Sequence, residues 1–139
     1  MGQFDGGKPV LVIDGSRFDD YDEFAREFSA LLNDWTWNKN PDAFNDILRG
    51  GFGTPEGGFV LRWLHSDRSR QALGWSETVQ YLEDVLARCH PSNRERIRAE
   101  VEAARRQEGR TLFDFLVEIV QRHGAGGNES EDGIDLELL

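Results

Sequence analysis

Three short apolar runs, separated by helical segments, constrain the fold of this chain most strongly. Val10–Ile13 is continuous and β-branched, Phe59–Leu61 is short and apolar, and Ile134–Leu138 alternates apolar with acidic residues. A continuous run is typical of a strand covered on both faces, and alternation is typical of a strand with one solvated face. Because strands separated by helices need crossover connections, the sequence predicts an α/β fold, with a small parallel sheet and helices packed around it.

Two helices are predicted between the first and second runs. Asp20 stands three residues before Glu23, as in a capping box, and opens a helix with a periodic apolar stripe. The stripe consists of Tyr21, Phe24, Phe28, Leu31, Leu32 and Trp35. The second helix begins with Asn40 as N-cap and Pro41 at its first position, and ends at Gly50–Gly51. Its buried side consists of Phe44, Ile47 and Leu48.

Residues 75–110 are predicted to form further helices. One of them opens at Ser92, where Glu95 completes a second capping-box pattern. The last helix follows Thr111, which can cap it, and leads through an acidic, glycine-rich connector to the final apolar run. We expect residues 1–139 to form a single domain.

The chain is strongly acidic. Its 139 residues include 26 Asp and Glu against 16 Lys and Arg, which gives a formal net charge of −10. Residues 1–57 carry 11 acidic and 5 basic residues, residues 58–110 carry 8 and 10, and residues 111–139 carry 7 and 1. Nucleic-acid binding and anionic membranes require the opposite charge, so we expect a basic partner, no nucleic acid and no membrane. The uneven distribution predicts one acidic face.

Cysteine content and the N-terminus indicate a reducing compartment. The one cysteine, Cys89, has no partner for an internal disulfide and cannot supply a structural zinc site by itself. No stretch approaches the roughly 20 apolar residues of a membrane helix, and the N-terminus lacks the pattern of a signal peptide. We therefore expect a cytoplasmic protein.

Signatures of catalysis are nearly absent. The glycines of residues 50–58 lack the spacing of a phosphate-binding or dinucleotide-binding loop. None of the three histidines, His65, His90 and His123, stands at ligand spacing from another histidine or a cysteine. We therefore predict no enzyme, no catalytic residues, no metal and no cofactor. A minor alternative is a small hydrolase that uses Asp42, Asp46 and His65 with a divalent ion.

Asp42 and Asp46 form the most informative pair of residues. Four positions apart, they share one face of the predicted second helix, opposite Phe44, and repel each other by a few tenths of a kcal/mol. Asp42 has a structural explanation, because a carboxylate in the first turn favours the helix N-terminus. Asp46 lies too deep for that, although Arg49 can offset it as a solvated ion pair. The pair is thus either a solvated surface or a surface that presents carboxylates to cations.

At this pair the sequence resembles a known family. The run Asn40–Leu48, followed by Gly-Gly-Phe and by Phe59–Trp63, is similar to the barstar family of intracellular inhibitors of barnase-like, guanyl-preferring ribonucleases. The resemblance covers residues 9–64 and 111–139, and it implies a barstar-like three-stranded parallel sheet flanked by helices. Residues 75–110 have no counterpart in short family members, so we expect them to be a helical insertion.

The resemblance also implies a partner-binding site and a mechanism. In the family, two aspartates on the second helix enter the ribonuclease active site, and the loop ahead of that helix and a late glutamate add contacts. The corresponding residues are Asp42, Asp46, Thr36, Trp37, Asn38 and Glu118, with Asn45 in place of the family's aromatic residue. Asp46 is then the deeper anchor and Trp37 an aromatic contact beside it, while Trp35 and Trp63 are expected in the core. The mechanism requires both carboxylates to point outward and to be free of neighbouring arginines.

A second interpretation uses the insertion itself. Residues 75–110 contain a dense set of arginines, namely Arg94, Arg96, Arg98, Arg105, Arg106 and Arg110. In this alternative the chain is a barstar-like interaction module that acts through the arginine-rich segment on another partner, an acidic protein or a second copy. Interspersed glutamates make a solvated face the simpler explanation of the same pattern.

Overall fold

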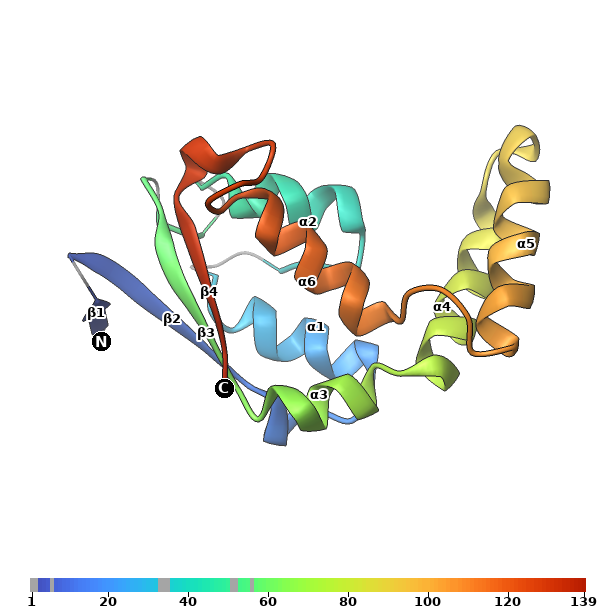
Figure 1. Ribbon diagram of the computed structural model, residues 1–139, viewed down its shortest axis with the longest axis horizontal. Coiled ribbons are helices and arrows are strands. Elements are labelled where there is room, and N and C mark those ends of the chain that lie inside the picture. The colour runs from blue at the N-terminus through green and yellow to red at the C-terminus, as the bar shows by residue number, and fades with distance from the viewer. Residues whose placement is uncertain (1–2, 6, 33–35, 51–52, 56) are drawn as a thin grey trace.

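The strands form one sheet whose order follows the sequence, β1-β2-β3-β4 (Figure 1). The computed structural model describes residues 3–5, 7–32, 36–50, 53–55 and 57–139. The strands are β1 (Gln3–Asp5), β2 (Lys8–Asp14), β3 (Phe59–Leu64) and β4 (Ile134–Leu138). The last three pair in parallel, as predicted, in a register that joins Val10 to Val60 and Phe59 to Ile134. The antiparallel edge strand β1 was not predicted.

The helices of the body lie on one face of the sheet. They are α1 (Tyr21–Ser29), α2 (Pro41–Leu48) and α6 (Leu112–Arg122), and Figure 1 shows all three on the same side of the strands. A sheet built in sequential order by right-handed crossovers sends every crossover to the same side. The expectation that Val10–Ile13 is covered on both faces holds only in part: no helix of the body covers the open face, where Val12 is half-buried, whereas Val10 on the same face is buried.

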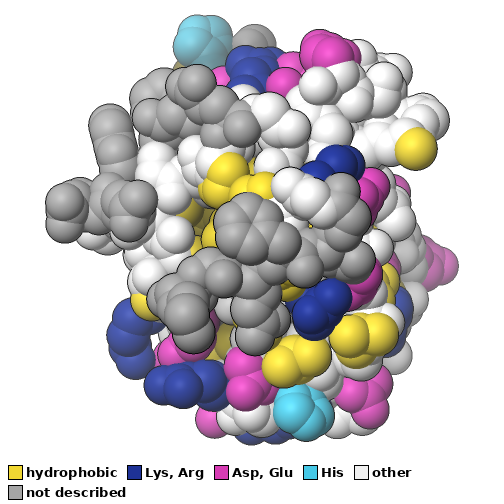
Figure 2. Space-filling model, turned by 90° about the vertical axis from the view of Figure 1, so that its left-hand side faces the viewer, with side chains coloured by type: hydrophobic (Ala, Val, Ile, Leu, Met, Phe, Trp, Pro, Cys, Tyr) yellow, Lys and Arg dark blue, Asp and Glu magenta, His cyan; other side chains and the backbone are white. Residues whose placement is uncertain are grey.

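Ion pairs span the open face. Lys8 Nζ lies 3.0 Å from Asp135 Oδ2, and Arg62 Nε lies 2.6 Å from Glu137 Oε1, each pair joining residues from different strands. Figure 2 views the molecule from this side and shows acidic, basic and hydrophobic side chains interspersed. The alternation of β4, with Ile134 inward and Asp135 outward, agrees with the prediction of one solvated face.

An aromatic cluster joins the covered face to the helices. Phe24 of α1 stacks on Trp63 of β3 with ring centroids 5.4 Å apart, and Phe28 lies 4.8 Å from Phe44 of α2. Trp63 is fully buried, as expected, and its indole N–H donates to Ser69 Oγ. Trp35, the other predicted core tryptophan, lies outside the described residues.

The predicted helix starts are confirmed with one exception. Asp20 accepts a hydrogen bond from the Glu23 amide at the start of α1, and Thr111 forms a full capping box with Asp114 at the start of α6. The predicted capping box at Ser92 is wrong. His90 there accepts the Ser92 amide and caps a short 3-10 turn, Pro91–Asn93, so that α5 (Arg94–Arg105) begins two residues later.

The remaining helices form a lobe beside the body. After the short α3 (Ser66–Ala72), α4 (Trp75–Arg88) and α5 form an antiparallel hairpin that projects from the body in Figure 1. Arg105 of α5 lies 3.3 Å from Glu83 of α4, and Val101 is buried between the helices. Within the described residues, none of the helices combines the length and apolarity that crossing a bilayer demands.

Asp14 at the end of β2 gives a pH-dependent prediction. Hydrogen bonds from the hydroxyl and amide of Ser16 hold the pKa of Asp14 at about 2, below its usual 3.8, and His65 contributes a further contact at 3.0 Å. Loss of this cap in Asp14→Ala should lower the free energy of unfolding by about 1 kcal/mol at pH 7.

Because the pKa of Asp14 is lower in the folded protein than in the unfolded chain, its carboxylate adds to the free energy of unfolding at any pH above the unfolded pKa. This contribution is lost as the pH falls from the unfolded pKa to the folded pKa. The difference between wild type and Asp14→Ala in urea unfolding should therefore narrow between pH 4 and pH 2. Ser16→Ala is the matched variant, because it keeps the carboxylate of Asp14 but removes the hydrogen bond from the hydroxyl. The pKa of Asp14 should then rise, so its contribution to stability should be lost at a higher pH than in the wild type. A difference that stays constant with pH would contradict this assignment.

Candidate functional site

The start of α2 fixes the orientation of the two candidate carboxylates. Asn40 Oδ1 accepts hydrogen bonds from the amides of Asp42 at 2.8 Å and Ala43 at 3.2 Å, as predicted for an N-cap. Phe44 and Leu48 point into the core from the opposite side of the helix. Asp42 and Asp46 are consequently exposed on the solvent face of α2.

Trp37 lies beneath the segment that leads into α2. Its ring is 2% exposed, packs 4.9 Å from the ring of Phe44, and donates its indole N–H to the carbonyl of Asn40 at 2.8 Å. The burial of Trp37 corrects the expectation that its ring is presented to a partner, because the aromatic cluster of α1 surrounds it. Thr36 and Asn38 on either side are exposed.

Asp46 satisfies the requirement for a free carboxylate only in part. Its Oδ1 accepts a hydrogen bond from Arg49 Nη1 at 2.8 Å, and the side chain of Asp46 is 57% exposed. Exposed ion pairs of this kind contribute about 0–1 kcal/mol, so a stronger cation can displace Arg49. Asp42 makes no ion pair with any described residue, and it meets the requirement in full.

Arg49 also connects α2 to the connector after α6. Its Nη2 lies 2.5 Å from Glu129 Oε1. Burial tends to raise the pKa of Glu129, but the hydrogen bond from Arg49 and the charges of Arg49 and His123 outweigh it and leave the pKa below its usual value. The bond to Glu129 in turn raises the pKa of Arg49. Glu129 is therefore an ionised carboxylate close to Asp46.

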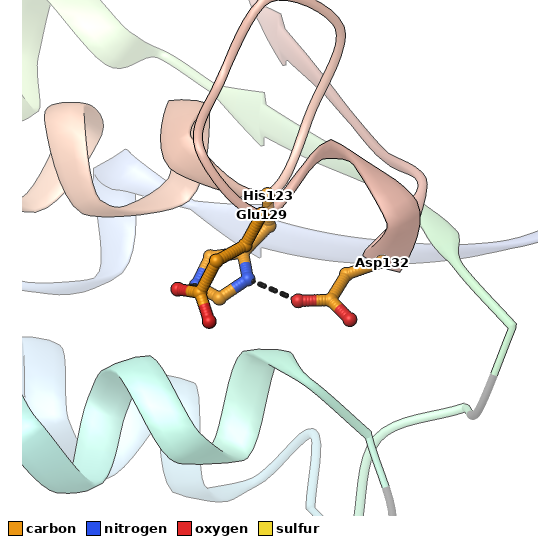
Figure 3. A group of neighbouring side chains, drawn as sticks. All are labelled: His123, Glu129 and Asp132. Carbon is orange, nitrogen blue, oxygen red and sulfur yellow. Dashed lines mark hydrogen bonds and ion pairs between the residues drawn. The ribbon is translucent and has the colours of Figure 1, made fainter.

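His123 forms the buried centre of this connection (Figure 3). The ring is 0% exposed at the C-terminus of α6, its Nδ1 lies 2.6 Å from Asp132 Oδ2, and its Nε2 lies 2.8 Å from Asn45 Oδ1. Asn45 also hydrogen-bonds Glu129 through its side chain. The ring thus links the end of α6 both to α2 and to the connector.

The same group has the composition of a metal site. Ligand atoms of His123, Glu129 and Asp132 all lie within 4.8 Å of one another. Both ring nitrogens of His123 already have hydrogen-bond partners, and Arg49 pairs with Glu129, so a metal ion must first displace these contacts. The contacts present favour a hydrogen-bonded network.

Glu118 lies apart from α2. It pairs with Arg110 and faces a hollow of about 750 Å³ that also contains Arg122 and Asp135, and no residue of α2 lines this hollow. Its expected contact with a partner stays a prediction. Glu129 and Asp132 lie beside α2 instead, and the acidic connector was the one sequence signal that could have pointed to them.

The three residues suggested for a divalent-ion hydrolase, Asp42, Asp46 and His65, do not lie together. His65 pairs with Asp14 at the end of β3, and Figure 1 shows that end of the sheet opposite to α2. The combination of Asp42, Asp46 and His65 is corrected accordingly, because the β3–α3 turn holds His65 far from the acidic helix.

Comparison with known proteins identifies a family. A family model described as barstar (barnase inhibitor) matches residues 8–107, which is more than half of the chain and includes α2 and most of residues 75–110. Neither a curated protein nor a solved structure matches the chain.

The buried network predicts a large effect of His123 on stability. His123→Ala removes a buried ring and leaves the carboxylate of Asp132 and the amide of Asn45 without this partner, which should lower the free energy of unfolding by about 2–4 kcal/mol. Urea unfolding at pH 7 measures the change. His90→Ala, at an exposed histidine that caps one turn, should cost about 1 kcal/mol or less. Equal losses for the two variants would contradict the network.

Proposed function

The chain belongs to the barstar family, and from that premise we propose that it inhibits a barnase-like, guanyl-preferring ribonuclease or ribonuclease toxin. In this proposal α2 and the preceding residues 36–40 enter the cationic active site of the nuclease and exclude RNA. The chain performs no catalysis, uses no cofactor, and acts in the cytoplasm as an immunity-type inhibitor. Its partner is a basic protein.

The exposed face of α2 carries the proposal. Asp42 and Asp46 stand four residues apart on a helix whose opposite face is locked into the aromatic cluster. A ribonuclease active site holds cationic side chains that bind phosphate, and carboxylates on a rigid helix accept charge-assisted hydrogen bonds from the same groups. Rigidity matters because little conformational entropy is then lost on binding.

The charge around α2 supports rapid association with a basic enzyme. The two acidic segments of the chain, residues 1–57 and 111–139, meet where Asn45 contacts His123, so Glu129 and Asp132 add their charge beside α2. A concentrated negative field steers a basic protein toward this face, and the effect weakens as salt screens it.

Arg49 limits what Asp46 can do until the partner arrives. Its guanidinium is about half exposed and shared between Asp46 and Glu129. We propose that an arginine or lysine of the nuclease replaces Arg49 on Asp46, while Arg49 keeps its contact with Glu129. Asp42, with no such competitor among the described residues, is available from the outset.

The arginine-rich alternative has less support. Arg96, Arg105, Arg106 and Arg110 each pair with a glutamate, namely Glu100, Glu102, Glu108 and Glu118. These pairs neutralise much of the basic charge of residues 75–110 and fit a solvated face. We also propose that residues 75–110 are a helical insertion in a single domain.

The carboxylates give the direct test. Asp42→Asn and Asp46→Asn should each weaken inhibition of a barnase-type ribonuclease by about tenfold or more, and the double variant by about a hundredfold or more, because each removes a charge-assisted contact in the active site. Inhibition constants from RNA cleavage assays measure the change.

The control is Asp67→Asn, which removes the same charge from exposed α3 at the other end of the sheet. It should change inhibition by less than about twofold. Circular dichroism should show unchanged folding for every variant. A folded double variant that inhibits as well as the wild type would reject the site.

A further inference from the structure

A groove separates the body of the molecule from the α4–α5 hairpin. It encloses about 1080 Å³ and is lined by the start of α1, by residues 38–42 and by one side of α4. Asp42, the unpaired carboxylate of α2, lies on its rim. The groove is therefore continuous with the surface that we propose enters the nuclease.

The wall formed by α4 has a repeating polar pattern. Glu77, Tyr81, Asp84 and Arg88 recur at intervals of four, three and four residues, which places them on one face of the helix. All four line the groove. Leu82 instead borders a separate hollow toward α5, and Val85 lines both the groove and that hollow. This face of α4 is thus a polar surface aimed at α2.

Most charged groups in the groove already have partners. Asp22 pairs with Lys39 at 2.5 Å, Glu77 accepts the amide of Tyr21 at 2.8 Å, and Asp20 caps α1. Asp42 and Asp84, one on each wall, make no side-chain ion pair with any described residue. The two walls therefore hold negative charge that the chain itself leaves unbalanced.

Tyr81 supplies a phenolic oxygen on the same wall as Asp84, and this oxygen can accept a hydrogen bond from a cation. Its ring packs edge-on against Tyr21 with centroids 5.6 Å apart, and its hydroxyl has no hydrogen-bond partner in the described part of the chain. Burial and the nearby charge of Asp42 raise the pKa of Tyr81 despite the opposing charge of Arg88, so the hydroxyl keeps its proton. A phenol beside two carboxylates suits a guanidinium or ammonium group, which can also contact the aromatic face.

We propose that this groove receives an arginine- or lysine-bearing segment of the inhibited nuclease, next to the segment that α2 occupies. The inference rests on the proposed function and extends it, because it makes α4 a second recognition element. Five carboxylates against two cations give the groove a net negative charge that matches a basic enzyme. Asp42 then contacts the nuclease on the side that faces the groove.

Binding to a barnase-type ribonuclease that the wild type inhibits tests the proposal. Asp84→Asn should weaken the dissociation constant about tenfold, and Tyr81→Phe about threefold, because each removes one polar contact to the bound cation. Glu95→Gln is the matched control, since it removes one charge from the exposed first turn of α5 outside the groove. It should stay within about twofold of the wild type.

The outcomes separate this inference from the function on which it rests. If the wild type binds the nuclease and Asp84→Asn and Tyr81→Phe have the same dissociation constant as the wild type, the role of the groove is rejected and the proposed function stands. Failure of the wild type to inhibit any barnase-type ribonuclease would overturn the proposed function, and with it the occupant. Sedimentation of the chain by itself completes the test: a dimer that dissociates in Asp84→Asn would make the occupant a second copy and overturn the proposal.

Discussion

The packing of Phe44 against Phe28 and Trp37 holds α2 to the body, and the presentation of its carboxylates depends on this contact. Buried aromatic rings have little rotational freedom, so the helix axis and the angle of its outer face are fixed together. Trp37 contributes twice, since its indole N–H also fixes the carbonyl of the N-cap residue, Asn40. The acidic surface is therefore rigid before any partner binds.

A polar network also holds the other end of α2 to the body. His123 joins Asn45 to Asp132, and Arg49 joins Asp46 to Glu129, so α2, α6 and the acidic connector are linked through one buried ring and one exposed guanidinium. The charge of Arg49 lowers the electrostatic cost of placing Asp46 and Glu129 near each other. The sequence places Asp46 far from Glu129 and Asp132 in the chain, and this network brings the three side chains together.

Local signals predicted the fold better than they predicted the site. The parallel strands, the caps at Asp20, Asn40 and Thr111 and the exposed position of Asp42 and Asp46 follow from short patterns that tertiary contacts did not override. The link from His123 to Asn45 joins residues 78 positions apart, and no local pattern encodes it. Trp37 was ambiguous for a related reason, because an aromatic residue before a helix is equally suited to a core and to an interface.

Competition with a nucleotide in the nuclease active site tests the central claim most directly. If an acidic helix fills the groove that binds RNA, guanosine 3′-monophosphate bound to a barnase-type ribonuclease must leave before this chain can bind. The account predicts that the apparent dissociation constant rises in proportion to nucleotide concentration. A constant that does not change at saturating nucleotide would place the contact outside the active site and contradict the account.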